Sequence, residues 1–440
     1  MGKLKKLAWD AALLTGASLL MRCIGLAYQV WLAGRIGSAG IGLWQLVMSV
    51  NVLTATLAIS GIRFTTTRLV SEELGRHRES VDGAVLRCLC YAALFGSAAC
   101  LILFFGAEPI GFLWVGDART VLPLRIIAFA MPMIALSSVW NGYFIASGQA
   151  WKTAAVQVTE QIIGIGCVVL ALRRVPGEDL ELSCAAVARG NLIADAVSML
   201  LICTLYLAER RRRVLRGGGS PALTGRMLRI AVPLALSAYA RTGLTTLENL
   251  LVPRKLRSAG YSADAAISGY GAITGMVFPI ITFPSCLLSA VAELTVPELT
   301  AAQVQNDRRR IRAVVTKLLR MTLLFSLVTA GGLFLFADIL GQRIYHDASL
   351  GKYIRIFALL VPLMYMDIVT DGCLKGLGQM MRSMVFNISE AFLGVLLVIT
   401  VLPVWALNGY IFVLFVCETY NFTLSIHRLV KVVGLRPGMN

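Results

Sequence analysis

One pattern occurs twice in this chain, as AMPMIALSSVWNGYFIASGQAWKTAAVQVTEQIIG at 130–164 and as LVPLMYMDIVTDGCLKGLGQMMRSMVFNISEAFLG at 360–394. A single shift of about 230 positions superposes the two stretches without a gap. The residues it pairs are Pro132 with Pro362, Gly142 with Gly372, Gly148 with Gly378, Gln149 with Gln379, Lys152 with Arg382, Gln157 with Asn387, Thr159 with Ser389, Glu160 with Glu390 and Gly164 with Gly394. Self-similarity of this kind predicts a chain built from two equivalent halves.

A second match supports the same division. The first predicted helix of each half runs into the tripeptide SAG, at 38–40 and at 258–260. The spacing of Ser18, Arg22 and Gln29 before the first copy is repeated by Ser237, Arg241 and Glu248 before the second. Between the halves lies the basic, glycine-rich stretch ERRRRVLRGGGSPALTGRMLR at 209–229. We therefore predict two lobes, 1–208 and 229–440, joined by a cytoplasmic basic linker at 209–228.

The composition excludes a soluble protein. Hydrophobic residues make up 57% of the chain and charged residues 15%, and the mean hydropathy is +0.75. A soluble domain carries about 25% charged residues, because its surface must be hydrated. The net charge of +17 would suggest a nucleic-acid ligand in a soluble protein. In a membrane protein it is better explained by basic loops that face anionic lipid on the cytoplasmic side, so no nucleic-acid partner is expected.

Apolar windows predict about twelve membrane-spanning helices, six in each half, and hence an all-α polytopic membrane protein. The predicted segments are 9–33, 42–64, 85–106, 121–146, 153–172, 187–208, 229–252, 267–292, 314–337, 353–373, 384–404 and 407–427. A cytoplasmic N-terminus puts most of the 41 Lys and Arg residues inside, and an even number of spans then places both termini in the cytoplasm. Six helices per half make the repeats parallel, as in two-lobe transporters that rock between states.

Signatures of enzymes, metal sites and cofactor sites are missing from the sequence. The chain has no GxSxG, HExxH or Walker A motif, and its ten cysteines form no CxxC pair. We therefore expect no enzyme activity, no metal and no cofactor, and no ATP hydrolysis within this chain. A monomer is expected.

Charged side chains at membrane depth are the candidates for function. Arg22, Arg63 and Arg241 lie within predicted spans, where an arginine costs about 3 kcal/mol on insertion scales and so faces protein or a water-filled cavity. Polar residues share a helical face with two of them. The predicted substrate-binding residues of a central cleft are Arg22, Arg241, Arg63, Ser18, Gln29, Ser237, Thr245 and Glu248.

Acidic residues in the spans are candidates for ion or proton coupling. These are Glu160, Glu390, Asp195 and Asp367. Structural explanations stay open beside this one. An arginine can simply pair with a nearby carboxylate and lock helices together, and the symmetric pair Glu160 and Glu390 fits capping or lobe packing as well as ion binding.

Guanidinium groups in a cleft favour an anionic substrate, because they pair with phosphate through two hydrogen bonds. A cleft that opens to the bilayer suits a lipid phosphate, whose tail stays in hydrocarbon while its headgroup crosses.

Three stretches resemble a known family. SLLMRCIGLAYQVWLAGRIGSAGIGLWQ at 18–45 is similar to the opening of lipid II flippases and of the stage V sporulation protein B group, in which RCIG matches an Arg-x-x-Gly motif. ISGIRFTTTRLVSEEL at 59–74 resembles a segment of the sporulation group, with Arg63 at a position where that group has proline. The stretch 247–299 is similar to the group's seventh and eighth helices, up to its Val-Pro-Glu motif at 296–298.

The resemblance implies the multidrug/oligosaccharidyl-lipid/polysaccharide (MOP) exporter superfamily. Its members have two six-helix lobes, alternate access between the two sides of the membrane and hydrolyse no ATP. The flippase branch moves polyprenyl-diphosphate-linked sugars outward, and the resemblance places Arg22 at that branch's cavity arginine. Lipid II flippases have two further helices, which argues against lipid II itself as the cargo.

The sequence therefore predicts a flippase for lipid-linked oligosaccharides in the bacterial cytoplasmic membrane, serving cell-wall, polysaccharide or spore-envelope assembly. Its expected partners are an anionic lipid-linked glycan and membrane lipid. One alternative is a cation-coupled multidrug exporter of the same superfamily, which would rely on acids such as Asp195 or Asp367. A second is a non-transporting membrane protein of sporulation or germination.

Overall fold

The computed structural model describes residues 2–76, 81–175, 179–211, 222–305 and 307–434. Within these helices, side chains are described except at 2–19, 75–76, 211, 222, 293–294, 297, 301 and 304. No strand occurs in the described ranges, which confirms the all-α class. Part of the predicted linker, 212–221, and the side chain of Ser18 lie outside what is described.

All twelve predicted segments lie on helices. Seven helices are long and apolar enough to cross a membrane, and the number rises to nine if each of two bent pairs is one span, counting only the described residues. The long helices α1 (Gly2–Ile59) and α16 (Met380–Val433) each contain two predicted segments, and each is interrupted once, at Gly37 and at Ala406. Gly37 has φ 69° and ψ 178°, a conformation that is essentially restricted to glycine.

The chain forms two compact units. Unit 1 comprises 1–42 and 251–440, and unit 2 comprises 43–250. The grouping by contact thus places the start of the first predicted lobe with the second half, and 229–250 with the first half. The segment 209–228 joins two helices of unit 2. The lobes 1–208 and 229–440 remain a prediction about the repeat.

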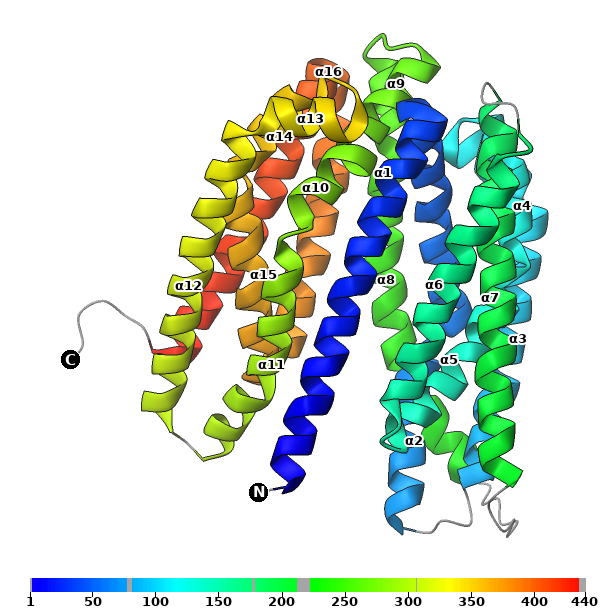
Figure 1. Cartoon of the computed structure of the whole chain (residues 1–440), viewed down its shortest axis with the longest axis vertical. Helices are drawn as coiled ribbons and strands as arrows, with labels where there is room; N and C mark the ends of the chain where they lie inside the picture. Colours follow the sequence, from blue (N-terminus) through cyan, green and yellow to red (C-terminus); the bar gives the residue numbers. More distant parts are fainter. Residues whose placement is uncertain (1, 77–80, 176–178, 212–221, 306, 435–440) are drawn as a thin grey trace. The chain divides into compact units, whose positions relative to one another are not determined.

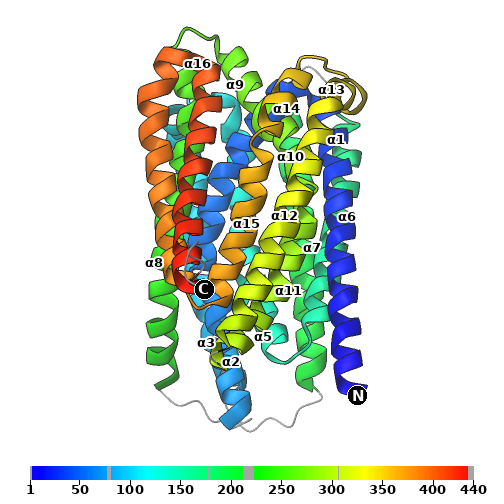
Figure 2. The same ribbon diagram turned by 90° about the vertical axis from the view of Figure 1, so that its left-hand side faces the viewer.

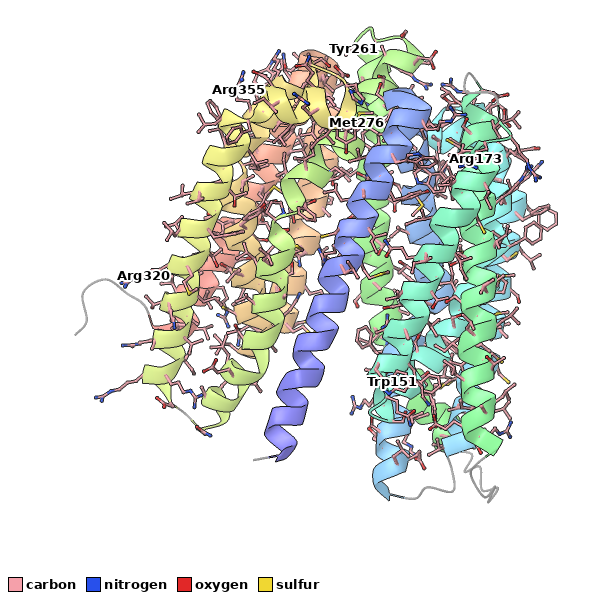
Figure 3. The ribbon with its side chains drawn as sticks, viewed as in Figure 1. Trp151, Arg173, Tyr261, Met276, Arg320 and Arg355 are labelled. Carbon is pink, nitrogen blue, oxygen red and sulfur yellow. The ribbon has the colours of Figure 1, made fainter. Side chains whose placement is uncertain are left out.

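Unit 2 is organised around one central helix, α5 (Ala130–Ala146), which packs against helices from both sides in the sequence. It contacts α2, α3 and α7 (Figure 1). Trp151 and Arg173 mark the two ends of its neighbour α6 in Figure 3. Its elements, besides the second part of α1 and α5, are α2 (Ile62–Arg76), α3 (Val81–Pro109), the π-helix η2 (Ile110–Val115), the 3₁₀ turn η3 (Ala118–Thr120), α4 (Val121–Ala128), α6 (Ala150–Leu172), α7 (Leu180–Arg211) and α8 (Ala222–Ser258) as far as Leu250.

Unit 1 repeats this plan around α15 (Val361–Gly376), which packs against α11, α12 and α16. The two parts of α16, orange and red, run back alongside each other in Figure 2. Its other elements, besides the first part of α1, are α9 (Ala263–Gly271), the π-helix η4 (Ala272–Val277), α10 (Phe278–Thr282), α11 (Ser285–Val304), α12 (Arg308–Leu335), α13 (Ala337–Tyr345) and α14 (Leu350–Ala358).

The repeat extends beyond the stretches that the sequence comparison matched. An ion pair joins Arg125 to Glu108 at 2.6 Å in unit 2, and another joins Arg355 to Asp338 at 2.7 Å in unit 1. The helix pairs α4–α5 and α14–α15 are both bent, by 43° and 53°. The 230-residue shift relates Glu108 to Asp338 and Arg125 to Arg355, so the two ion pairs are equivalent in the repeat.

Small residues explain why the first part of α1 groups with unit 1. At the crossing of α1 and α9, the Oγ atoms of Ser38 and Ser268 lie 2.5 Å apart. A Cβ atom added to Gly271 would lie 2.3 Å from the carbonyl oxygen of Ser38, and one added to Gly42 would lie 2.1 Å from that of Ile267. The backbones of the two helices are therefore in direct contact, as small residues allow in membranes.

We predict that Gly271→Ala destabilises the protein by about 1–3 kcal/mol, because the new methyl group has only backbone to displace. Thermal unfolding of the purified protein in detergent measures the loss. Gly269→Ala is the matched control on the same helix, since its Cβ would lie 3.4 Å from a Leu407 side chain, an ordinary contact. Equal melting temperatures of the two variants would contradict the proposed crossing.

Candidate functional site

A cavity of about 390 Å³ in unit 1 contains Arg22, and we call it the Arg22 cavity. α1 contributes Arg22, Gly25, Leu26 and Gln29, and the opposite wall contains Thr274, Phe278, Pro279, Thr282 and Phe283. The Arg22 guanidinium makes no ion pair with any side chain in the described part of the chain. Its charge is therefore available to a ligand.

Gln29 holds the opposite wall of this cavity in place. Its Nε2 donates a hydrogen bond of 3.0 Å to the carbonyl oxygen of Gly275, in the π-helix η4. The hydroxyls of Thr274 and Thr282 donate to carbonyls of their own helices, those of Tyr270 and Phe278. The cavity therefore combines one free cationic head, an amide and an aromatic wall formed by Phe278 and Phe283.

A second cavity, of about 170 Å³, lies in unit 2, and we call it the acidic cavity. It brings together Arg63 from α2, predicted to bind substrate, with Glu160 from α6 and Asp195 from α7, both predicted to couple ions or protons. The other residues that line it are Ile59, Ile134, Ser137, Ser138, Asn141, Val156, Gln157 and Ser198. Ser198 Oγ donates to Glu160 Oε2 at 2.5 Å.

Unit 1 contains a third polar group of side chains, around Asp367 on α15. Asn421 Nδ2 donates to Asp367 Oδ2 at 3.2 Å and to Asn387 Oδ1 at 3.1 Å. Glu390 is half-buried on α16. Asn421 is not among the predicted site residues, although Asn191 stands at its position in the 230-residue repeat.

The predicted residues of α8 lie in neither cavity. Arg241 and Thr245 are exposed, and Ser237 and Glu248 are half-buried. The hydroxyls of Ser237 and Thr245 donate to the carbonyls of Leu234 and Arg241, on their own helix. Arg22 belongs to unit 1 and Arg241 to unit 2, and the predicted grouping of both arginines in one cleft stays a prediction.

We predict that Gln29→Ala speeds hydrogen–deuterium exchange in peptides that cover η4 (272–277), because the wall of the Arg22 cavity loses its hydrogen bond to α1. Mass spectrometry of the purified protein measures the exchange. Gln45→Ala is the control on the same helix, since Gln45 lines neither cavity. Unchanged exchange in the Gln29 variant would show that this contact does not fix the wall.

Comparisons with known proteins agree on one class. A family model described as "Polysaccharide biosynthesis protein" matches residues 7–297, and the MatE model matches 257–400. The chain is 24% identical over 407 residues to stage V sporulation protein B of Bacillus subtilis (strain 168), covering 90% of this chain and 78% of that protein. It is 22% identical to sporulation protein YkvU of the same organism, covering 86% and 84%.

Solved structures share its fold. An inward-facing multidrug resistance MATE family transporter of the MOP superfamily superposes with a TM-score of 0.72 at 14% identity, covering 95% of this chain and 96% of the other. An outward-facing conformation of such a transporter gives 0.61 at 15% identity, covering 97% and 96%.

Proposed function

The chain belongs to the polysaccharide biosynthesis protein family, and from that premise we propose that this multi-pass transporter of the MOP superfamily is a flippase for lipid-linked oligosaccharides. The cargo would be a sugar chain on a polyprenyl diphosphate, moved from the inner to the outer leaflet of the bacterial cell membrane by alternating access. The proposed orientation places both termini in the cytoplasm, and the proposed transporting species is a monomer.

The unpaired Arg22 guanidinium is the observation that carries the proposal. Arg22 is exposed at the cavity that it lines, and an arginine at membrane depth without a partner is costly unless a ligand or water supplies the missing interactions. Hydrogen bonds between guanidinium and phosphate are charge-assisted and frequently come in pairs. Phe278 and Phe283 give the other side of the cavity an apolar surface, which suits the first isoprene units of a lipid.

The remaining predicted residues take supporting roles in this proposal. Gln29 shapes the cavity through Gly275. Ser18, Ser237, Arg241, Thr245 and Glu248 are proposed to contact the cargo at another stage of transport. The acidic cavity and the Asp367 cluster, with Glu390 nearby in the sequence of α16, are proposed to couple transport to a cation or a proton.

A second candidate is a cation-coupled multidrug exporter. The Asp367 cluster favours it, because Asp367 and Asn387 lie within the 257–400 stretch that the MatE model matches. Carboxylate and amide oxygens are ligands that hard cations prefer. The free guanidinium of Arg22 argues for an anionic cargo, since a cationic drug would be repelled by it.

We predict that Arg22→Ala lowers the amount of polyprenyl-phosphate lipid that copurifies with the protein by about tenfold to a hundredfold, the loss expected when a charged hydrogen-bond pair is removed. Native mass spectrometry measures the bound lipid. The same variant should fail to complement a flippase-deficient strain while its protein level stays normal. Arg35→Ala is the control, because Arg35 is exposed on the same helix and lines neither cavity.

Wild-type lipid content and complementation in the Arg22 variant would remove the assignment. Export of cationic drugs by the wild-type protein, without copurified lipid, would support the multidrug exporter instead.

A further inference from the structure

The acidic cavity of unit 2 has the ligand set of a cation site. Carboxylates come from Glu160 and Asp195, and hydroxyl and amide oxygens come from Ser137, Asn141 and Ser198. Hard monovalent and divalent cations bind to oxygen atoms of these types. The Oδ1 atom of Asn141 is buried and accepts no hydrogen bond from the described residues, so one oxygen ligand remains available.

A fixed cation is already present in this cavity. Arg63 is half-buried and is the one basic residue among the described side chains that line it. Its guanidinium forms no ion pair with Glu160, with Asp195 or with any other described carboxylate in this conformation. The cavity therefore contains a guanidinium and two carboxylates without direct contact between them.

The backbone is shaped to bring Arg63 there. α1 ends at Ile59, and Ser60 and Gly61 take positive φ angles of 48° and 73° before α2 begins. The turn is held by tyrosines of two other helices: Tyr239 Oη hydrogen-bonds to Ser60 Oγ, and Tyr91 Oη donates to Ser60 Oγ at 3.1 Å. Arg63 thus lies in the first turn of α2, directly after this turn, and lines the acidic cavity.

The backbone of Arg63 is held on its C-terminal side as well. Thr67 Oγ1 donates to the carbonyl oxygen of Arg63 at 2.9 Å and to that of Gly142, on α5, at 3.2 Å. Because its backbone is fixed between α2 and α5, movement of Arg63 is limited to its side chain. The long arginine side chain is flexible enough to take more than one position within a cavity of this size.

In the Asp367 cluster of unit 1, the carboxylate has a different kind of partner. There an amide, Asn421, donates to Asp367, and no arginine or lysine among the described residues forms an ion pair with it. Lys375 pairs instead with Asp371, at 2.6 Å. The two clusters therefore differ: a guanidinium without an ion pair lines the acidic cavity, whereas the lysine near Asp367 is paired with Asp371.

We propose that Arg63 is a built-in counter-cation for Glu160 and Asp195. The acidic cavity is then a cation site in which the bound cation is the guanidinium of Arg63 itself. Its side chain moves onto the carboxylates and away from them, in the place of a dissolved ion. The wild-type protein therefore takes up no free monovalent cation in unit 2. Removing the guanidinium opens the site to a small cation from solution. For the acidic cavity this inference replaces uptake of a dissolved cation, which leaves that part of the coupling role to the Asp367 cluster, and it does not depend on the lipid cargo.

Chemical rescue tests the proposal on the purified full-length chain. Thermal unfolding is recorded in detergent with N-methylglucamine chloride, with sodium chloride or with guanidinium chloride at non-denaturing millimolar concentrations and equal ionic strength. We expect the melting temperature of Arg63→Ala to be lowered in N-methylglucamine and restored by several degrees, saturably, by guanidinium and more weakly by sodium. The wild type should show no such saturable gain.

Two further variants make the result specific. Arg63→Ala combined with Glu160→Gln should lose the rescue, because the carboxylate that binds the added cation is gone. Arg68→Ala is the matched control on α2, where Arg68 is exposed and pairs with Glu72 at 3.1 Å, and it should gain nothing from guanidinium.

If Arg63→Ala cannot be purified, Arg63→Gln replaces it, because glutamine keeps most of the side-chain volume without the charge. The proposal is overturned if neither variant gains stability from guanidinium or sodium. It is also overturned if the wild type gains as much as the variants do.

Discussion

The cost of burying charge in a membrane is the constraint on which the rest of this structure depends. An arginine within a membrane-spanning helix must meet water, a ligand or an opposite charge, since hydrocarbon offers it nothing. Arg22 meets this demand in a cavity of about 390 Å³, and Arg63 meets it in a cavity that also contains Glu160 and Asp195. Both cavities are thus lined by an arginine from a predicted membrane span, and these two cavities are the candidate functional sites.

Breaks in the helices lie next to residues that line both cavities. The turn at Ser60 and Gly61 precedes Arg63, which lines the acidic cavity. In unit 1, the carbonyl oxygen of Gly275 in the π-helix η4 accepts a hydrogen bond from Gln29. Backbone groups released by such breaks need partners in a membrane, and side chains supply them here: Tyr239 donates to the carbonyl of Leu57 beside the turn. The same irregularities that disturb helical hydrogen bonding therefore position the chemistry.

Much of the fold could be predicted, because hydropathy and a repeat of 230 residues can be read directly from the sequence. All twelve predicted segments lie on helices, and the repeat even relates the ion pairs Glu108–Arg125 and Asp338–Arg355. The packing of 1–42 with the second half could not be predicted, since it depends on the contact of Gly271 with Ser38 and Gly42 in three dimensions. For the same reason the sequence could not show that Arg63 lines one cavity with Glu160 and Asp195, and its role in binding the cargo stays a prediction.

We propose that guanidinium chemistry selects an anionic lipid for transport across the bilayer. It is tested most directly by reconstituting the protein in liposomes with two fluorescent glycolipids of equal sugar and tail, one linked through diphosphate and one through an uncharged ether. Quenching by a membrane-impermeant reductant reports the fraction that reaches the outer leaflet. We expect protein-dependent quenching of the inner-leaflet diphosphate lipid and none of the inner-leaflet ether lipid. Equal transport of both lipids, or of neither, would contradict it.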